Sequence, residues 1–127
     1  MTANGSIKFA SLFTPGQVLC NIPQTTHEEA LKEILKHLAY QCGIGNVDDT
    51  YDMVMEREQL QSSVVGPGMA MPHTRLDAIN RLVVGVATSE QGIMFGDDES
   101  QRVNLIILIL APRSDPALYL INSKGIE

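Results

Sequence analysis

Cysteine is scarce in this sequence, which holds two cysteines among its 127 residues. Cys20 and Cys42 are widely separated and form no Cys-x-x-Cys pair, so neither a zinc knuckle nor a redox dithiol is indicated. Because free cysteine is among the residues most often buried, we predict that both side chains lie in the interior as small hydrophobic groups. Cysteine chemistry is therefore not expected.

Basic residues are also few, with nine Lys and Arg against fifteen Asp and Glu and a formal net charge of -6. A nucleic-acid partner is not expected, because neutralising a phosphate backbone takes clustered positive charge and the basic residues here are dispersed. The longest apolar run, residues 105–111, is far shorter than the roughly 20 residues of a membrane span, and no secretion signal is evident. We therefore expect a cytoplasmic protein without direct membrane insertion.

The most distinct helical pattern follows Thr26. Thr26 and Glu29 form a capping box, and Gly43 is a typical helix terminator. Between them apolar residues recur at helical spacing: Ala30, Leu31, Ile34, Leu35, Leu38, Ala39 and Cys42. His27 and His37 lie on the same predicted helix, ten residues apart, which is not a metal-ligand spacing, and we expect both near the surface.

A second helix is predicted from Asp48 or Asp49, either of which would serve as its N-cap, to about Gln59. Extended segments are predicted at residues 17–22, 62–65, 69–72 and 81–88. Residues 103–110 form a near-continuous apolar run, which is typical of a strand covered on both faces. We predict that this run is the central strand of a sheet.

Helices that alternate with strands predict the α/β class, as a mixed β-sheet sandwiched by helices on both faces. Residues 1–127 are expected to form a single domain. Only residues 117–122 remain for a last helix, which predicts a shortened C-terminal helix and poor cover for one face of the central strand. We expect either that part of a longer C-terminal end is lacking or that a partner covers the gap.

His73 follows a Gly-Pro-Gly turn and a run of small apolar residues. A histidine is mostly neutral at pH 7, with a lone pair that can attack an electrophile such as phosphorus. Pro72 fixes its own φ and favours an extended conformation for the residue before it, so the ring leaves a rigid segment in a defined direction. His73 is therefore the candidate nucleophile; taken alone, a partly buried histidine with a structural role is the commoner case.

A phosphohistidine carrier also needs donors for the phosphoryl oxygens and an apolar surface that excludes water. Arg57 is the candidate oxyanion partner, because a guanidinium binds phosphoryl oxygens through paired hydrogen bonds. The simpler interpretation of Arg57 is a cation that stabilises a helix C-terminus. Ser62 and Ser63 are candidate hydroxyl donors. Candidates for an apolar rim, or else ordinary core residues, are Met53, Met55, Met69, Met71 and Met94.

Residues 57–73, REQLQSSVVGPGMAMPH, resemble the signature of the enzyme IIA domains of the fructose/mannitol class in the bacterial phosphoenolpyruvate-dependent sugar phosphotransferase system. The shared features are an Arg-Glu pair, a pair of small hydroxyl residues and a glycine-framed Gly-x-Ala-x-Pro-His. A looser similarity extends over almost the whole chain from Phe9. The resemblance implies that His73 is phosphorylated, through Nε2, and that Arg57 clamps the phosphoryl oxygens.

The resemblance also implies partners. Phosphorylated HPr, a phosphocarrier protein, would donate to His73, and a cysteine of a sugar-specific enzyme IIB would receive the phosphate during sugar or polyol uptake. The chain would then be a phosphotransferase component. The alternative is a nitrogen-regulatory IIA, whose phosphorylation state switches its binding to a regulator or transporter. An inert domain whose histidine is never modified is a third possibility. No metal or other cofactor is indicated, and the Gly-x-Ser-x-Gly motif of a serine hydrolase is absent.

Two features differ from the family pattern. Several relatives carry a second histidine after the last central strand, whereas residues 114–120 contain none. Phosphoryl stabilisation would then rest on Arg57 and backbone N–H groups. Relatives usually continue through a full C-terminal helix, so the shorter end here raises the expectation of a homodimer.

Overall fold

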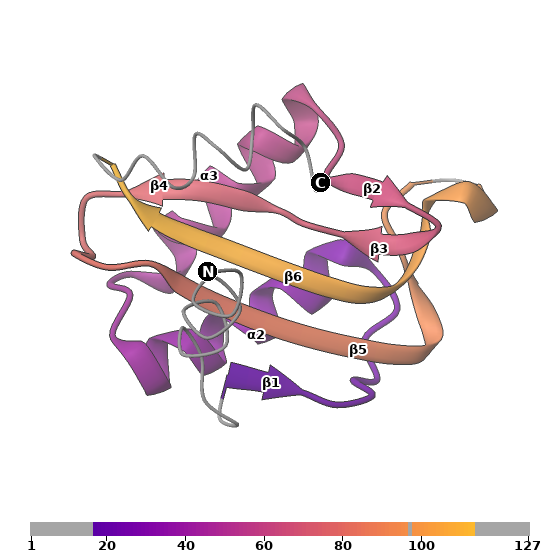
Figure 1. The fold of residues 1–127 in the computed structure, drawn as a ribbon, viewed down its shortest axis with the longest axis horizontal. Helices are drawn as coiled ribbons and strands as arrows, with labels where there is room; N and C mark the ends of the chain where they lie inside the picture. Colours follow the sequence, from indigo (N-terminus) through magenta and orange to yellow (C-terminus); the bar gives the residue numbers. More distant parts are fainter. Residues whose placement is uncertain (1–16, 97, 114–127) are drawn as a thin grey trace, which may run out of the picture.

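The computed structural model describes residues 17–96 and 98–113. In these residues, one mixed sheet of six strands packs against two long helices (Figure 1). The strands are β1 (Val18–Leu19), β2 (Val64–Gly66), β3 (Gly68–Ala70), β4 (His73–Leu76), β5 (Val83–Met94) and β6 (Arg102–Pro112), with a short 3-10 helix, η2 (Glu99–Gln101), before β6. The predicted α/β class with a mixed sheet is confirmed.

β6 is the central strand, as the apolar run in the sequence predicts. The strand order is β1-β5-β6-β3-β2, and β4 also pairs with β6. β5 is antiparallel to β6, whereas β3 and β4 are parallel to it and follow one another along the same edge of β6. β1 is parallel to β5, and β2 is antiparallel to β3. This arrangement fixes where β4 begins. Pro72, just before the strand, is hydrogen-bonded to Ile109 of β6, and Thr74, its second residue, pairs with Leu110 of β6.

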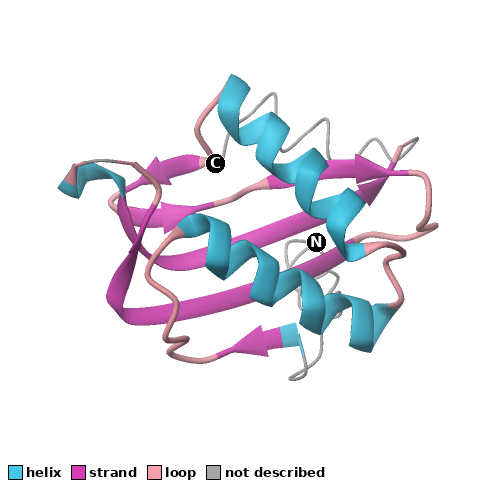
Figure 2. Cartoon of the chain, turned by 180° about the vertical axis from the view of Figure 1, so that it is seen from behind, coloured by secondary structure: helices cyan, strands magenta, loops and turns pink. Residues whose placement is uncertain are grey.

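The helices α2 (His27–Cys42) and α3 (Val47–Leu60) cover the same face of the sheet (Figure 2). The predicted caps of α2 are confirmed: the hydroxyl of Thr26 accepts from the backbone N–H of Glu29 at 3.3 Å, and Gly43 ends the helix with φ 68°. The prediction of helices on the second face concerns residues 117–122, which lie outside the described residues.

The predicted N-cap of α3 was wrong. Asn46, not Asp48 or Asp49, precedes the first turn, and its side-chain oxygen accepts from the backbone N–H of Asp49 at 2.9 Å. The two aspartates lie inside the first turn instead, where negative charge still favours the helix dipole. The sequence does not distinguish an N-cap at Asn46 from one at Asp48 or Asp49, because asparagine and aspartate are equally good caps.

The main core lies between the helices and the sheet. It combines the apolar stripe of α2 with alternate residues of β6, namely Leu31, Ile34, Leu35 and Leu38 with Ile106, Leu108 and Leu110. Gly85 on β5 permits this close packing, because a Cβ atom there would lie 2.9 Å from side-chain atoms of both Ile34 and Leu38. Each such buried side chain contributes about 1.5–3 kcal/mol of hydrophobic stabilisation.

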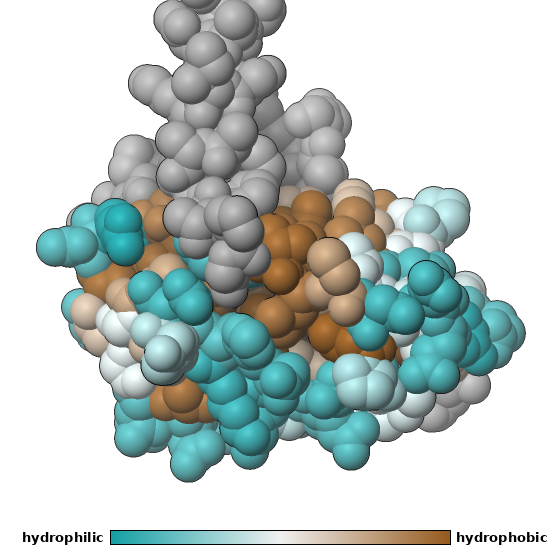
Figure 3. Space-filling model, turned by 90° about the horizontal axis from the view of Figure 1, so that it is seen from below, coloured by the Kyte–Doolittle hydropathy of each residue, from teal (hydrophilic) through white to brown (hydrophobic). Residues whose placement is uncertain are grey.

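A second apolar cluster lies on the other face of the sheet, and we call it the outer-face cluster. It consists of Met71, Ile109 and Ala111, with Met69, Leu82 and Ile107 packed against them. Its β6 members alternate with the core members, and side chains alternate between the faces of a strand. In Figure 3, apolar residues gather at the level of the sheet, while polar residues cover the side that carries the helices.

The prediction for the cysteines was partly wrong. Cys20 is exposed, because β1 has only two residues and the chain turns directly afterwards at Asn21, which has φ 50°. Cys42 is partly buried and packs against the main core. Across residues 17–96 and 98–113, neither helix has the length and apolar character that a membrane span requires. The single-domain expectation for residues 1–127 stays a prediction.

Candidate functional site

His73 is the first residue of β4, and the central strand holds it in place. In the register of the two strands His73 lies opposite Ile109, whose backbone N–H donates to the carbonyl of Pro72 at 2.9 Å. α3 packs against β4, and its C-terminal end lies beside the edge of the sheet (Figure 1). The imidazole is half-buried, so it combines a fixed backbone with access from outside.

Each ring nitrogen of His73 has one partner. Nδ1 lies 3.3 Å from the carbonyl oxygen of Met71, and Nε2 lies 3.0 Å from Nη2 of Arg57. A carbonyl only accepts and a guanidinium only donates. These contacts therefore select the neutral tautomer, with its proton on Nδ1 and its lone pair on Nε2. The lone pair of Nε2 therefore faces the guanidinium of Arg57, which stays positively charged at all ordinary pH values.

Arg57 reaches the imidazole from the last turn of α3. Its own carbonyl accepts from the backbone N–H of Gln61 at 3.1 Å, which closes the helix. The arginine is exposed along its side chain, so its guanidinium is free to reorient more readily than a buried one. The two interpretations of Arg57 from the sequence are thus compatible, because a helix-end cation also lies against the candidate nucleophile.

The surroundings of His73 keep the imidazole neutral. Burial lowers the pKa of His73, the hydrogen bond to the Met71 carbonyl raises it, and the charge of Arg57 lowers it further. Smaller effects on this pKa come from Glu58, which raises it, and from Arg75, which lowers it. The net direction is downward. A lowered pKa leaves Nε2 unprotonated at neutral pH, which is the state that a nucleophile requires.

Ser62 and Ser63 lie beside the site, but among the described residues no hydrogen bond joins either hydroxyl to His73. The Ser62 hydroxyl accepts from the backbone N–H of Val64 at 3.2 Å. The backbone of Ser63 donates to the carboxylate of Glu58 at 3.0 Å and accepts from the N–H of Met71 at 2.8 Å. The Ser63 hydroxyl itself is buried and has no hydrogen-bond partner among residues 17–96 and 98–113. A buried, unused donor next to Met71 is unusual, because such groups are nearly always paired.

The outer-face cluster borders the site. Met71, whose carbonyl holds the imidazole, belongs to it, and Met69 packs against it. By contrast, Met53 and Met55 pack against the main core, and Met94 belongs to neither cluster. Two of the five predicted rim methionines thus belong to the apolar cluster next to His73.

Sequence reasoning missed Arg75 and the role of Glu58. Arg75 is two residues beyond His73 on the same strand, and its charge acts on the pKa of His73. The signal was present, since residues two apart on a strand share a face, but the predicted extended segment ended at residue 72, just before β4. Glu58 was noted as part of the Arg-Glu pair, and the structure shows its carboxylate bound to the backbone of Ser63.

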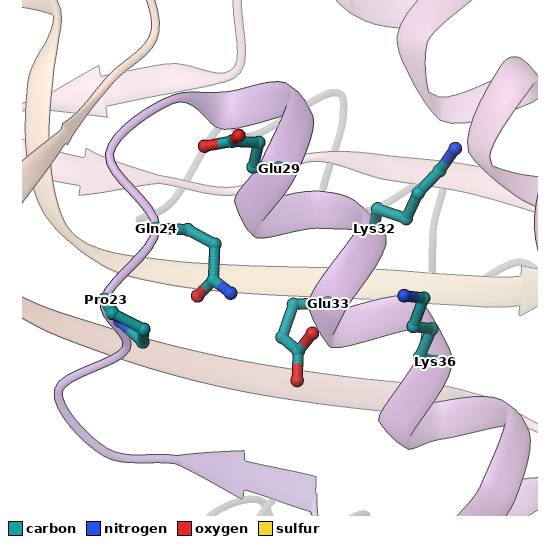
Figure 4. A pocket seen from close by; sticks show the side chains of 6 residues that line it. All are labelled: Pro23, Gln24, Glu29, Lys32, Glu33 and Lys36. Carbon is teal, nitrogen blue, oxygen red and sulfur yellow. The ribbon is translucent and has the colours of Figure 1, made fainter.

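Two further observations bear on ligand binding. Within the described residues, no group of three or more His, Cys, Asp or Glu side chains is arranged to hold a metal ion. Figure 4 shows a shallow groove beside α2, lined by Pro23, Gln24, Glu29, Lys32, Glu33 and Lys36. Its lining includes none of the site residues and balances two lysines against two glutamates.

Residues 11–123 match the family described as "Phosphoenolpyruvate-dependent sugar phosphotransferase system, EIIA 2". The "Nitrogen regulatory protein" of Bradyrhizobium diazoefficiens is 28% identical over 109 residues, which cover 86% of this chain and 71% of that protein. The "PTS system fructose-specific EIIA component" of Haloferax volcanii is 34% identical over 91 residues, or 71% of this chain and 58% of that protein. The crystal structure of "Nitrogen Regulatory Protein IIA-Ntr" from Neisseria meningitidis has a TM-score of 0.80 and 19% identity, over 92% of this chain and 80% of that one.

Proposed function

The chain belongs to the EIIA 2 family of the phosphoenolpyruvate-dependent sugar phosphotransferase system, and on this premise we propose that it is a phosphohistidine carrier. His73 accepts phosphate from a phosphorylated HPr-like protein and passes it to a sugar-specific enzyme IIB during sugar or polyol uptake. EIIA proteins of this system are phosphotransferase components, so the reaction class is that of the family. The observation that carries the proposal is the 3.0 Å contact between Nη2 of Arg57 and Nε2 of His73.

The transfer step uses the tautomer that the contacts select. The lone pair of Nε2 forms a new P–N bond, while the bond between phosphorus and the donor breaks and its electron pair leaves with the donor. Nδ1 keeps its proton and its bond to the Met71 carbonyl, so the ring stays oriented and shares the added charge. The second transfer repeats the step in reverse, with a cysteine thiolate of enzyme IIB as the nucleophile.

Arg57 has to change its position when phosphate arrives. In the unphosphorylated protein its guanidinium covers the lone pair of Nε2. Because the side chain is exposed, it can swing aside by rotation about its own bonds and still reach oxygens attached to the same nitrogen. Charge-assisted hydrogen bonds from the guanidinium then offset the two negative charges of the phosphoryl group. Arg57 thus protects the free histidine and clamps the phosphorylated one.

Ser63 is the proposed additional donor. Its hydroxyl is buried and has no partner in the described part of the chain, although its backbone N–H bonds to Glu58 and its carbonyl to Met71. A phosphoryl oxygen would satisfy this hydroxyl, which has a desolvation cost in the free protein. Ser62 is exposed and already accepts from Val64, so its contribution is the weaker of the two. Met69, which is partly buried and packs against Met71, is the proposed part of the apolar rim against which a protein partner excludes water from the phosphohistidine.

A nitrogen-regulatory role is the second candidate. The observation that favours it is the match to a "Nitrogen regulatory protein" over 86% of the chain. Both candidates share the phosphorylation of His73 and differ in its consequence. In the regulatory case, the phosphorylation state of His73 switches binding to a regulator or a transporter, and no sugar is carried.

One reconstitution tests both candidates. The chain is incubated with enzyme I, HPr and radiolabelled phosphoenolpyruvate, and acid-labile label on His73 is expected. Absence of label would contradict both candidates and leave an inert domain. A panel of enzyme IIB proteins is then added to the labelled chain. Loss of label to one of them supports sugar transfer, and retention of label with all of them favours the regulatory role.

A further inference from the structure

Glu58 ties the segment that leaves α3 back to the helix. Its side chain is partly buried in the last turn, and its Oε2 accepts from the backbone N–H of Ser63 at 3.0 Å. Ser63 lies shortly after the end of α3 and just before β2, and it is itself buried. A hydrogen bond to a charged acceptor is stronger than a neutral one. The carboxylate of Glu58 therefore fixes the backbone of Ser63 relative to the helix.

Ser63 in turn holds the residue whose carbonyl orients the imidazole. The carbonyl of Ser63 accepts from the backbone N–H of Met71 at 2.8 Å, which continues the antiparallel pairing of β2 and β3 beyond the ends of both strands. The carbonyl of Met71 lies 3.3 Å from Nδ1 of His73. Three successive hydrogen bonds thus lead from the carboxylate of Glu58 to the ring nitrogen that does not react.

The other ring nitrogen is bound by the same turn of α3. Arg57 directly precedes Glu58 in the chain, and its Nη2 lies 3.0 Å from Nε2 of His73. Two consecutive helical residues therefore act on the two sides of one imidazole, Arg57 directly and Glu58 through Ser63 and Met71. Because a helical turn is rigid, this arrangement sets the plane of the ring relative to the guanidinium.

We propose that Glu58 is a positioning residue of the site, whose carboxylate acts as a hydrogen-bond acceptor that holds Ser63 and thereby sets the Met71 carbonyl against Nδ1 of His73. The proposal rests on the phosphohistidine function. A ring held in one orientation directs the lone pair of Nε2 at the incoming phosphorus, and small errors in such an alignment slow a reaction strongly. The role requires an acceptor rather than a negative charge, so an amide oxygen should fulfil it.

The test compares Glu58→Ala, Glu58→Gln and the control Glu56→Ala in the full chain. Glu56 is exposed on the same helix, and its charge is not among those that act on the pKa of His73. Three quantities are measured: hydrogen exchange of the Met71 amide, the ¹⁵N shifts of the His73 imidazole, which report its tautomer, and the single-turnover rate of labelling from phosphorylated HPr. Labelling is measured at about pH 8, where the imidazole is neutral in every variant.

Glu58→Ala should speed exchange of the Met71 amide and slow labelling, each by roughly tenfold, and should lower the share of the Nδ1–H tautomer. Glu58→Gln should keep all three quantities near wild type, because its amide oxygen still accepts from Ser63. The same variant should lower the pKa of His73, since the charge of Glu58 raises that pKa. Glu56→Ala should match wild type throughout.

Each outcome decides the proposal. If Glu58→Ala labels as fast as Glu56→Ala, Glu58 does not position the ring. If Glu58→Gln loses as much rate as Glu58→Ala, the charge matters and the acceptor role is excluded. If Glu58→Ala speeds exchange throughout β6 as much as at Met71, Glu58 stabilises the whole fold and the proposal is overturned. If the wild-type chain takes up no label, the phosphohistidine function fails, whereas the exchange and the imidazole shifts still decide whether Glu58 holds the ring.

Discussion

Nη2 of Arg57 lies 3.0 Å from Nε2 of His73, although the two residues are 16 positions apart in the chain. The contact joins the C-terminal turn of α3 to the first residue of β4. It leaves Nε2 of His73 unprotonated and next to a cation that does not titrate. A site built in this way suits a nucleophile that becomes negatively charged when it has reacted.

Arg57→Ala should slow the labelling of His73 by about 10²–10³-fold without abolishing it, because the nucleophile remains while the main oxyanion donor is lost. Arg57→Lys should recover part of this rate, since it keeps the charge but lacks the two-pronged geometry. Single-turnover transfer from phosphorylated HPr measures the rates. Arg81→Ala is the control for a general loss of positive charge. Wild-type rates in Arg57→Ala would show that the clamp is misassigned.

His73→Ala should abolish the acid-labile label while the fold is retained. The ring is half-buried and makes only two side-chain hydrogen bonds, so the change in the free energy of unfolding should be about 1–2 kcal/mol. Phosphorylation assays and circular dichroism measure the two quantities. His37→Ala, on the outer side of α2, should label like the wild type. Label that persists in His73→Ala would place the phosphorylated residue elsewhere.

Ser63→Ala should shorten the lifetime of the phosphohistidine without lowering the stability of the unphosphorylated protein. Removing a buried hydroxyl that has no partner should leave the unphosphorylated protein as stable as wild type, or more stable by up to about 1 kcal/mol. The phosphohistidine should nevertheless hydrolyse several-fold faster, because a donor to its oxygens is lost. The matched control is Ser89→Ala, whose buried hydroxyl accepts from the N–H of Gly92 at 3.0 Å. That variant should lose stability and keep the wild-type hydrolysis rate. If Ser63→Ala instead lost stability and kept the wild-type hydrolysis rate, Ser63 would not be part of the site.

The lowered pKa of His73 predicts a pH dependence of stability. In the unfolded chain this histidine titrates near the ordinary value of about 6.5, and in the folded protein it titrates at a lower pH, chiefly because of burial. Between the two values the unfolded state binds more protons, so stability is fully present above about pH 6.5 and declines as the pH falls through the folded pKa. Urea unfolding of wild type and His73→Gln at several pH values measures this. The stability difference between the two proteins should become less favourable to wild type in acid. A difference that is constant with pH would contradict the lowered pKa.

The elements predicted well from the sequence are those determined by local chemistry. α2 is bounded by Thr26 and Gly43, whose capping preferences act within a few residues. β6 is identified by its apolar run rich in β-branched residues, which is typical of a strand covered on both faces. The N-cap of α3 was misassigned for the opposite reason, since three neighbouring residues have nearly the same capping preference.

The candidate site residues were proposed from their chemistry, and their spatial arrangement was not predicted. Arg57 and His73 were named from residue type and from the resemblance, but the distance between them depends on how α3 crosses the edge of the sheet. The strand order, with β3 and β4 sharing one edge of β6, rests on pairings far apart in sequence that no local pattern encodes. Arg75 was missed because the expected extended segment ended before His73, and β4 begins there.

Gly85 offers a test of how α2 is held against the sheet. A Cβ atom at this position would lie 2.9 Å from side-chain atoms of both Ile34 and Leu38, which are buried in the tightly packed core. Gly85→Ala should therefore lower the free energy of unfolding by about 1–3 kcal/mol through overpacking. Gly66→Ala is the matched control, because nothing lies within 4 Å of a Cβ atom there. Urea unfolding measures both variants. If Gly85→Ala were as stable as Gly66→Ala, the close contact of Ile34 and Leu38 of α2 with β5 at Gly85 would be contradicted.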